Sequence, residues 1–238
     1  MSEGPQPHQK RGCTWVQVIV GLIAALLVAS ALITPRTGLR ERGETSKGIS
    51  NCRQIITALR IYSSDHDGKY PDAFLQNTSN ANEVFRELFK AGVLEGSDAE
   101  SMFGCAVSPF VPDFNIGEAP EFKLAVEAGE NHWAMTKGVN DRDPGSIPLV
   151  YENPAVATWS PKWNVDAKET KTRGRAWRNG IIIGMNDSSV GIQPLASKTG
   201  TAVPMKDLGS GSDQNLFSQY DDKAPAGGWV ILDVKAKR

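Results

Sequence analysis

The longest hydrophobic run of the chain lies near its N-terminus, where residues 14–34 include no charged side chain. At ~1.5 Å per residue, a helix over this run spans roughly 30 Å, the thickness of the hydrocarbon core of a bilayer. Lys10 and Arg11 precede the run, and Pro35 follows it. The pattern therefore predicts a single transmembrane helix at residues 14–34.

Two other interpretations of this run stay open. A cleaved secretory signal would use Ala29, Ser30 and Ala31 as its small-residue cleavage site, but the run exceeds the usual apolar length of about 7–15 residues. A helix buried in a globular core is the second alternative, and the absence of any polar face along the run argues against it. The membrane anchor is thus the preferred interpretation.

A second hydrophobic pattern follows, and here apolar positions alternate with polar ones at helical spacing. Polar residues such as Arg53 and Ser63 occupy the opposite face. This pattern predicts an amphipathic helix over residues 46–66, with an extension back to Pro35 as the alternative. The apolar positions are Ile49, Cys52, Ile55, Ile56, Leu59 and Tyr62.

Further along the chain, short helical patterns give way to strand patterns. Asn82 is expected to cap a helix that ends at Ala91, and residues 120–127 are expected to form another. Residues 196–219 show no regular period and predict an exposed loop. Short apolar runs after Gly129 indicate strands. These strands are residues 133–136, 149–152, 179–185, 189–193 and 229–234.

The order of these elements, helices first and strands later, predicts an α+β fold. A long N-terminal helix, transmembrane and then amphipathic, is expected to pack on an antiparallel β-sheet. The globular part is assigned to residues 35–238, with mixed α and β structure over residues 72–160. Residues 161–238 are assigned to β-sheet and loops.

Composition and charge narrow the function classes. Of 238 residues, 40% are hydrophobic and 22% are charged, which excludes a wholly disordered chain. The net charge is −1, so the molecule as a whole is not a polyanion binder. A polyanion site limited to the basic residues and tryptophans between Lys162 and Arg178 is an alternative, but a nucleic-acid partner is not expected.

Three short motifs carry a resemblance to a known family. They are Lys10-Arg11-Gly12 before the apolar run, Asn51-Cys52-Arg53-Gln54-Ile55, and the segment Tyr62-Ser63-Ser64-Asp65-His66-Asp67-Gly68-Lys69-Tyr70-Pro71. On these motifs the chain resembles type IV prepilins and the pseudopilins of type II secretion, in the variant with a long C-terminal extension. The similarity is clearest over residues 8–72.

The resemblance implies processing, topology and partners. A prepilin peptidase would cut between Gly12 and Cys13 and the new terminus would be methylated, with residues 1–13 as the cytoplasmic leader. The resemblance also implies a single-pass protein of the bacterial inner membrane, with residues 35–238 in the periplasm or outside the cell. Its implied partners are other pilin-like subunits and inner-membrane assembly proteins of the pilus or secretion system.

Two positions depart from the family pattern. Cys13 stands where the family usually has Phe, and Gln17 stands where it usually has Glu. That Glu is thought to offset the terminal ammonium of a neighbouring subunit, and Gln17 carries no charge to do so. We therefore expect a minor or atypical subunit with a structural or assembly role. The alternative is an anchored binding or adhesion protein that uses a pilin-like head without filament assembly.

The cysteines suggest one covalent bond. Cys52 and Cys105 would both lie in the oxidising exported compartment, where disulfides persist. A bond between them would close a loop of more than 50 residues and contribute about 4 kcal/mol in the chain-entropy model. Two separate thiols are the alternative.

The chain offers little catalytic chemistry, and we expect no enzyme. It contains no Ser-x-x-Lys, no Gly-x-Ser-x-Gly, no phosphate-binding loop and no His-Glu-x-x-His. His66 and His132 do not stand at recognisable metal-ligand spacing. No cofactor is expected. A structural calcium ion in the C-terminal loops is the alternative, with Asp213, Asp221 and Asp222 as candidate ligands.

Overall fold

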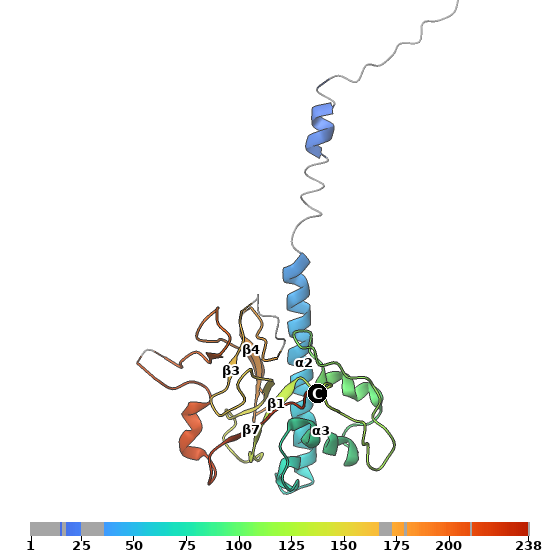
Figure 1. Ribbon diagram of the computed structural model, residues 1–238, viewed down its shortest axis with the longest axis vertical. Coiled ribbons are helices and arrows are strands. Elements are labelled where there is room, and N and C mark those ends of the chain that lie inside the picture. The colour runs from blue at the N-terminus through green and yellow to red at the C-terminus, as the bar shows by residue number, and fades with distance from the viewer. Residues whose placement is uncertain are drawn as a thin grey trace, which may run out of the picture. The chain divides into compact units, whose positions relative to one another are not determined.

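A computed structural model describes residues 15, 18–24, 36–166, 173–178, 180–209 and 211–237 (Figure 1). The predicted processing residues Gly12 and Cys13 and the assembly residue Gln17 lie outside these ranges, as does most of the predicted membrane segment 14–34. Among the helices of the described residues, none has the length and apolar character that a bilayer crossing requires. The chain divides into two units, Met1–Arg42 and Gly43–Arg238.

The predicted amphipathic helix is present and is longer than residues 46–66. Helix α2 spans Arg36–Ser64, so the alternative start near Pro35 is the correct one. From Gly48 onward one side of α2 is buried, with its side chains spaced three or four positions apart. The buried apolar residues of this side are Cys52, Ile55, Ile56, Ala58, Leu59 and Tyr62.

A tight turn ends α2. Asp67 and Gly68 both have positive φ, at 52° and 82°, and the Gly68 N–H donates to the Ser63 carbonyl over 2.9 Å. A Cβ atom on Gly68 would also collide with the Asp141 carboxylate. The position therefore requires glycine for its backbone conformation and for its close approach to a neighbouring segment.

Three short helices lie between α2 and the first strand. They are η1 (Pro71–Ala73), α3 (Ala81–Lys90) and η2 (Ser97–Phe103). The predicted helix after Asn82 is confirmed, but its cap is Asn80, whose side chain accepts from the Glu83 N–H. Asn82 instead donates to the carbonyls of Val126 and Glu127.

The helix predicted at residues 120–127 is wrong, because that segment forms turns. Phe122 and Val126 have positive φ, at 42° and 52°, which a right-handed helix excludes. The Val126 N–H donates to the buried Glu100 carboxylate over 2.7 Å. A tertiary hydrogen bond thus replaces the local helical one.

The strands form an antiparallel sheet in the order β5-β4-β2-β1-β7. All five expected strands are confirmed, with bounds that agree within a residue or two. Residues 196–219 are not simply a loop. They include strand β6, which pairs with β3, and the start of the helix η3 (Ser218–Lys223). The strand bounds are β1 Trp133–Lys137, β2 Pro148–Glu152, β3 Lys162–Trp163, β4 Ile181–Met185, β5 Val190–Gln193, β6 Val203–Pro204 and β7 Val230–Leu232.

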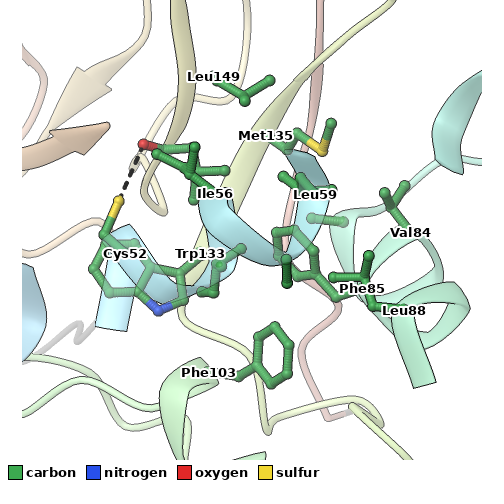
Figure 2. Packing of buried hydrophobic residues seen from close by; sticks show 14 of the residues in the cluster. Cys52, Ile56, Leu59, Val84, Phe85, Leu88, Phe103, Trp133, Met135 and Leu149 are labelled. Atoms are coloured by element: carbon green, nitrogen blue, oxygen red, sulfur yellow. Dashed lines mark hydrogen bonds between the residues drawn. The ribbon is translucent and has the colours of Figure 1, made fainter. Parts of the chain in front are cut away.

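Helix α2 lies against one face of this sheet. The cluster of buried side chains in Figure 2 joins α2, α3 and the strands β1 and β2. A Cβ atom on Gly184 of β4 would collide with Ile56 and would lie 2.9 Å from Cys52 Sγ, so this glycine sets how closely helix and sheet approach. A second apolar cluster with Tyr151, Trp163 and Phe217 covers the opposite face. The fold is therefore α+β with an antiparallel sheet buried on both faces.

Candidate functional site

A cavity of about 350 Å³ lies between the exposed turns of α2 near Glu44 and the segment that follows η2. Its lining is mainly apolar, and Glu44 and Lys47 are its charged members. The lining residues are Glu44, Lys47, Gly48, Asn51, Ser101, Gly104, Cys105, Ala106, Phe110, Val111, Pro112 and Phe114. Val111 and Phe114 are largely exposed, at 66% and 49%, so apolar side chains reach the surface beside the cavity.

Cys105 is held in the cavity wall by contacts to the residues that precede it in the sequence. Asn51 of α2 donates to the Gly104 carbonyl over 3.1 Å, and the Trp133 indole donates to the Met102 carbonyl over 2.9 Å. Gly48 allows this approach, because a Cβ atom there would lie 3.6 Å from Cys105 Sγ and 2.6 Å from a methyl group of Ile182.

Cys105 contacts a buried hydrogen-bond network centred on Glu152. The Trp177 indole donates to Oε1 over 2.7 Å, His132 Nε2 lies 3.2 Å from the same oxygen, and Cys105 Sγ lies 3.6 Å from it. The Ile182 N–H donates to Oε2 over 2.9 Å. Four donors therefore contact the Glu152 carboxylate, which has no exposed area. A buried carboxylate that accepts only requires several donors of this kind.

Asn153 orients His132. Its amide nitrogen lies 2.9 Å from both the His132 carbonyl and His132 Nδ1, while its oxygen accepts from the Gly174 N–H over 3.0 Å. Because the carbonyl requires a donor and the Gly174 N–H an acceptor, the orientation of the amide is fixed. Nδ1 therefore accepts a hydrogen bond, and the ring proton lies on Nε2, toward Glu152.

The charge of His132 is subject to opposing effects. Burial disfavours the imidazolium, whereas Cys105 and Glu152 favour it and shift the pKa of His132 upward. The second proton of an imidazolium would lie on Nδ1, where it would meet the amide hydrogens of Asn153. The anchored amide therefore opposes the charge that the neighbouring groups favour.

This arrangement limits the chemistry of Cys105. A base that activates a thiol must present an unprotonated nitrogen to it, but the ring nitrogen of His132 near Glu152 and Cys105 carries the proton. The network thus lacks the base orientation of a cysteine nucleophile. The three side chains do bring a thiol, an imidazole and a carboxylate together, with ligand atoms within 4.8 Å of one another.

A second group within the described residues joins Glu100, Asp113 and Glu130. Burial raises the pKa of Glu100 and of Glu130, and the acidic neighbours raise both further. Backbone N–H groups already bind one oxygen of Glu130 and both oxygens of Glu100. Those hydrogen bonds account for the burial of the two glutamates.

The calcium candidates of the C-terminal loops do not come together as a ligand set in the part of the chain that the structure describes. The Trp159 indole donates to Asp221 over 2.6 Å, and Asp222 lies 3.4 Å from the ammonium of Lys223. Neither aspartate shares a group with Asp213.

Cys52 and Cys105 are both free thiols in this structure, so the disulfide predicted between them is not formed here. Cys52 is fully buried, and its Sγ lies 3.6 Å from the Val150 carbonyl (Figure 2). Cys105 lies in the cavity wall, with its Sγ 3.6 Å from Glu152 Oε1.

The motif residues near the end of α2 have structural contacts. Arg53 and Gln54 are exposed on α2, while the Tyr62 ring stacks on His66 at 3.8 Å. The Tyr70 hydroxyl donates to the Asn186 side chain over 2.7 Å, and Pro71 begins η1. Tyr70 therefore connects the turn after α2 to the turn between β4 and β5.

Sequence reasoning missed Glu152, Asn153 and Trp177 and left His132 without partners. His132, the adjacent pair Glu152 and Asn153, and Trp177 come from three separate segments and meet only in the folded chain, so their spacing in the sequence does not reveal the group. One local signal was available: Glu152 follows directly on the apolar residues 149–151, and a charged residue that ends a buried apolar strand requires partners.

Comparison with known protein families, with curated proteins and with solved structures gave no match to this chain.

Proposed function

We propose that this protein is a membrane-anchored, pilin-like subunit of a type IV pilus or type II secretion system, with a structural or assembly role. The observation that carries the proposal is the single helix α2, Arg36–Ser64, whose C-terminal half is buried against an antiparallel sheet. In the sequence, α2 directly follows the uncharged run of residues 14–34. An anchor continued by a helix that forms part of the head is the arrangement expected of pilin-like subunits.

The contacts of α2 within the head support its role as a structural element of that head. Cys52, Ile56 and Leu59 are fully buried, and the Arg60 guanidinium donates to the Asn186 carbonyl over 2.7 Å. The buried part of α2 thus belongs to the core of the head.

The uncharged Gln17 favours a minor or terminal position of this subunit in a filament. If the chain is cut after Gly12, the new ammonium on Cys13 would lie near the hydrocarbon boundary. Leaving a desolvated charge unpaired costs several kcal/mol, and an uncharged carbonyl is a weaker partner than a carboxylate. A subunit with this feature is tolerated at a filament tip, where fewer neighbours surround it.

The test compares crosslinking to pilin-like partners in membranes for the native chain and for Gln17→Glu, together with the N-terminal mass of the extracted protein. We expect cleavage after Gly12 and stronger crosslinking for Gln17→Glu. Gln54→Glu is the matched control, because it makes the same change at an exposed position of α2. Recovery of an intact, full-length chain in the soluble fraction would contradict the proposed membrane anchor. An uncut Gly12–Cys13 bond would contradict the proposed assembly into a filament.

A second candidate is an anchored binding protein whose pilin-like head does not assemble. The cavity of about 350 Å³ beside Cys105 favours it, because a volume of this size is within the range of small-molecule sites. Absence of crosslinks to pilin-like partners, with the anchor retained, would favour this candidate over the first.

A further inference from the structure

We propose that Cys105, His132 and Glu152 form a binding site for a zinc-type divalent cation, with one coordination position directed toward the cavity that Cys105 lines. The three ligand atoms lie within 4.8 Å of one another. Thiolate, imidazole and carboxylate are the three side-chain ligands that zinc takes, and three protein ligands with one open position are typical of non-structural zinc sites.

Two of the three distances between the ligand atoms match a tetrahedral site. With bonds of about 2.1 Å to nitrogen and oxygen and about 2.3 Å to sulfur, the tetrahedral edges are about 3.4 Å for nitrogen to oxygen and about 3.6 Å for sulfur to oxygen. The observed separations are 3.2 Å between His132 Nε2 and Glu152 Oε1, and 3.6 Å between Cys105 Sγ and the same oxygen. The third pair, sulfur and ring nitrogen, lies within 4.8 Å, so side-chain adjustment closes the site around a cation.

The surroundings hold the carboxylate ligand in place. The Trp177 indole and the Ile182 N–H each donate to one oxygen of Glu152, which leaves lone pairs for a cation and fixes the side-chain rotamer. Outer hydrogen bonds of this kind orient metal ligands and are part of the site. Cys105 is only partly buried, and the cavity at its side gives the ion a path from solvent.

Binding requires a defined exchange of protons. The Cys105 S–H bond breaks, a sulfur–metal bond forms, and that proton goes to solvent. At His132 the cation takes the lone pair of Nε2, the Nε2 proton leaves, and Nδ1 gains one from solvent. The exchange releases one proton per ion and leaves Nδ1 as a donor.

Asn153 controls this exchange, because its amide nitrogen now faces Nδ1. Its side chain must turn so that the oxygen accepts from Nδ1–H, and its present bonds to the His132 carbonyl and the Gly174 N–H are then lost. The native site is therefore weakened by this residue. An aspartate at position 153 offers an oxygen to Nδ1–H and a second one to the Gly174 N–H.

The experiment titrates the full-length, detergent-purified chain with Co²⁺ after chelator treatment and follows the ultraviolet absorption from thiolate to cobalt. We expect one equivalent of Co²⁺ to produce this band and Zn²⁺ to remove it. Cys105→Ala should abolish the band and weaken binding more than about a hundredfold, beyond the effect of losing an outer hydrogen bond. Cys52→Ala is the matched control and should keep the band, because Cys52 lies against Val150 instead.

Asn153→Asp provides an independent test that does not remove a ligand. It should tighten Co²⁺ binding about tenfold, the scale of effects from outer hydrogen bonds. Circular dichroism of each variant shows that it is folded. Absence of the thiolate band in the native chain would overturn the proposal, as would equal bands in the native chain and folded Cys105→Ala. Metal bound without a thiolate band would identify surface carboxylates or histidines as the ligands instead.

Discussion

The Trp177 indole N–H donates to Glu152 Oε1 over 2.7 Å, inside the protein and across 25 positions of sequence. This bond joins the end of β2 to the segment that enters β4, and it is one of four that satisfy the same carboxylate. Glu152 therefore has a structural role in the metal-free protein, whatever its role toward a cation.

Replacing Glu152 by Gln is expected to lower the free energy of unfolding by about 2–4 kcal/mol, because an amide group would face the donors of Trp177, His132 and Cys105. Urea unfolding of the metal-free chain measures the change. Glu87→Gln is the control, since Glu87 pairs with its neighbour Lys90 in a partly exposed ion pair and such pairs contribute little. Equal midpoints for the two variants would contradict the role of Glu152.

Gly184→Ala is expected to lower the free energy of unfolding by about 1–3 kcal/mol, the usual range for overpacking a core. Its Cβ would collide with Ile56 and press on Cys52, both on α2. Gly191→Ala on the neighbouring strand is the control, because nothing lies within 4 Å of a Cβ at that position. A loss of stability for Gly191→Ala as large as that for Gly184→Ala would show that the approach of helix and sheet is not the cause.

Asp72→Asn is expected to raise stability at pH 7. Asp72 Oδ1 is the only buried side-chain nitrogen or oxygen of the described residues without a hydrogen-bond partner. Burial raises the pKa of Asp72, although the Gly138 N–H and the charge of Lys137 lower it in part. The folded state therefore binds the proton more tightly than the unfolded chain does, and the ionised carboxylate destabilises the fold above that pKa.

The gain from Asp72→Asn should shrink as pH falls through the raised folded-state pKa and vanish below the ordinary pKa of aspartate, where both states are protonated. Chemical unfolding at a series of pH values measures it, with Asp65→Asn at an exposed position as the control. A gain that is independent of pH would show that charge burial at Asp72 is not its source.

Cys105 should react with a thiol reagent in the folded protein much faster than Cys52, because Cys105 lines a cavity and Cys52 has no exposed area. Peptide mass mapping distinguishes these sites from Cys13. After denaturation without reductant, both should be labelled. Failure to label either one in the denatured chain would instead establish the disulfide that the sequence analysis predicted.

Local pattern determined the longer elements of this protein. The spacing of Cys52, Ile56 and Leu59 predicted the buried side of α2, and the apolar runs around Leu149 and Ile183 predicted central strands, because each element must bury one face or both. Local signals also failed where a distant group replaced them. Residues 120–127 form turns because Glu100 binds a backbone N–H that a helix would have used.

Only the tertiary structure decided the neighbours of the reactive side chains. The sequence placed Cys52 and Cys105 in one compartment and suggested a bond between them, but chain packing put Cys52 under β4 and Cys105 beside Glu152. His132 and Glu152 came together because β1 pairs antiparallel with β2, with Trp133 opposite Glu152. Such pairings depend on strand register and on burial shared by several elements, and the order of residues along one segment does not contain them.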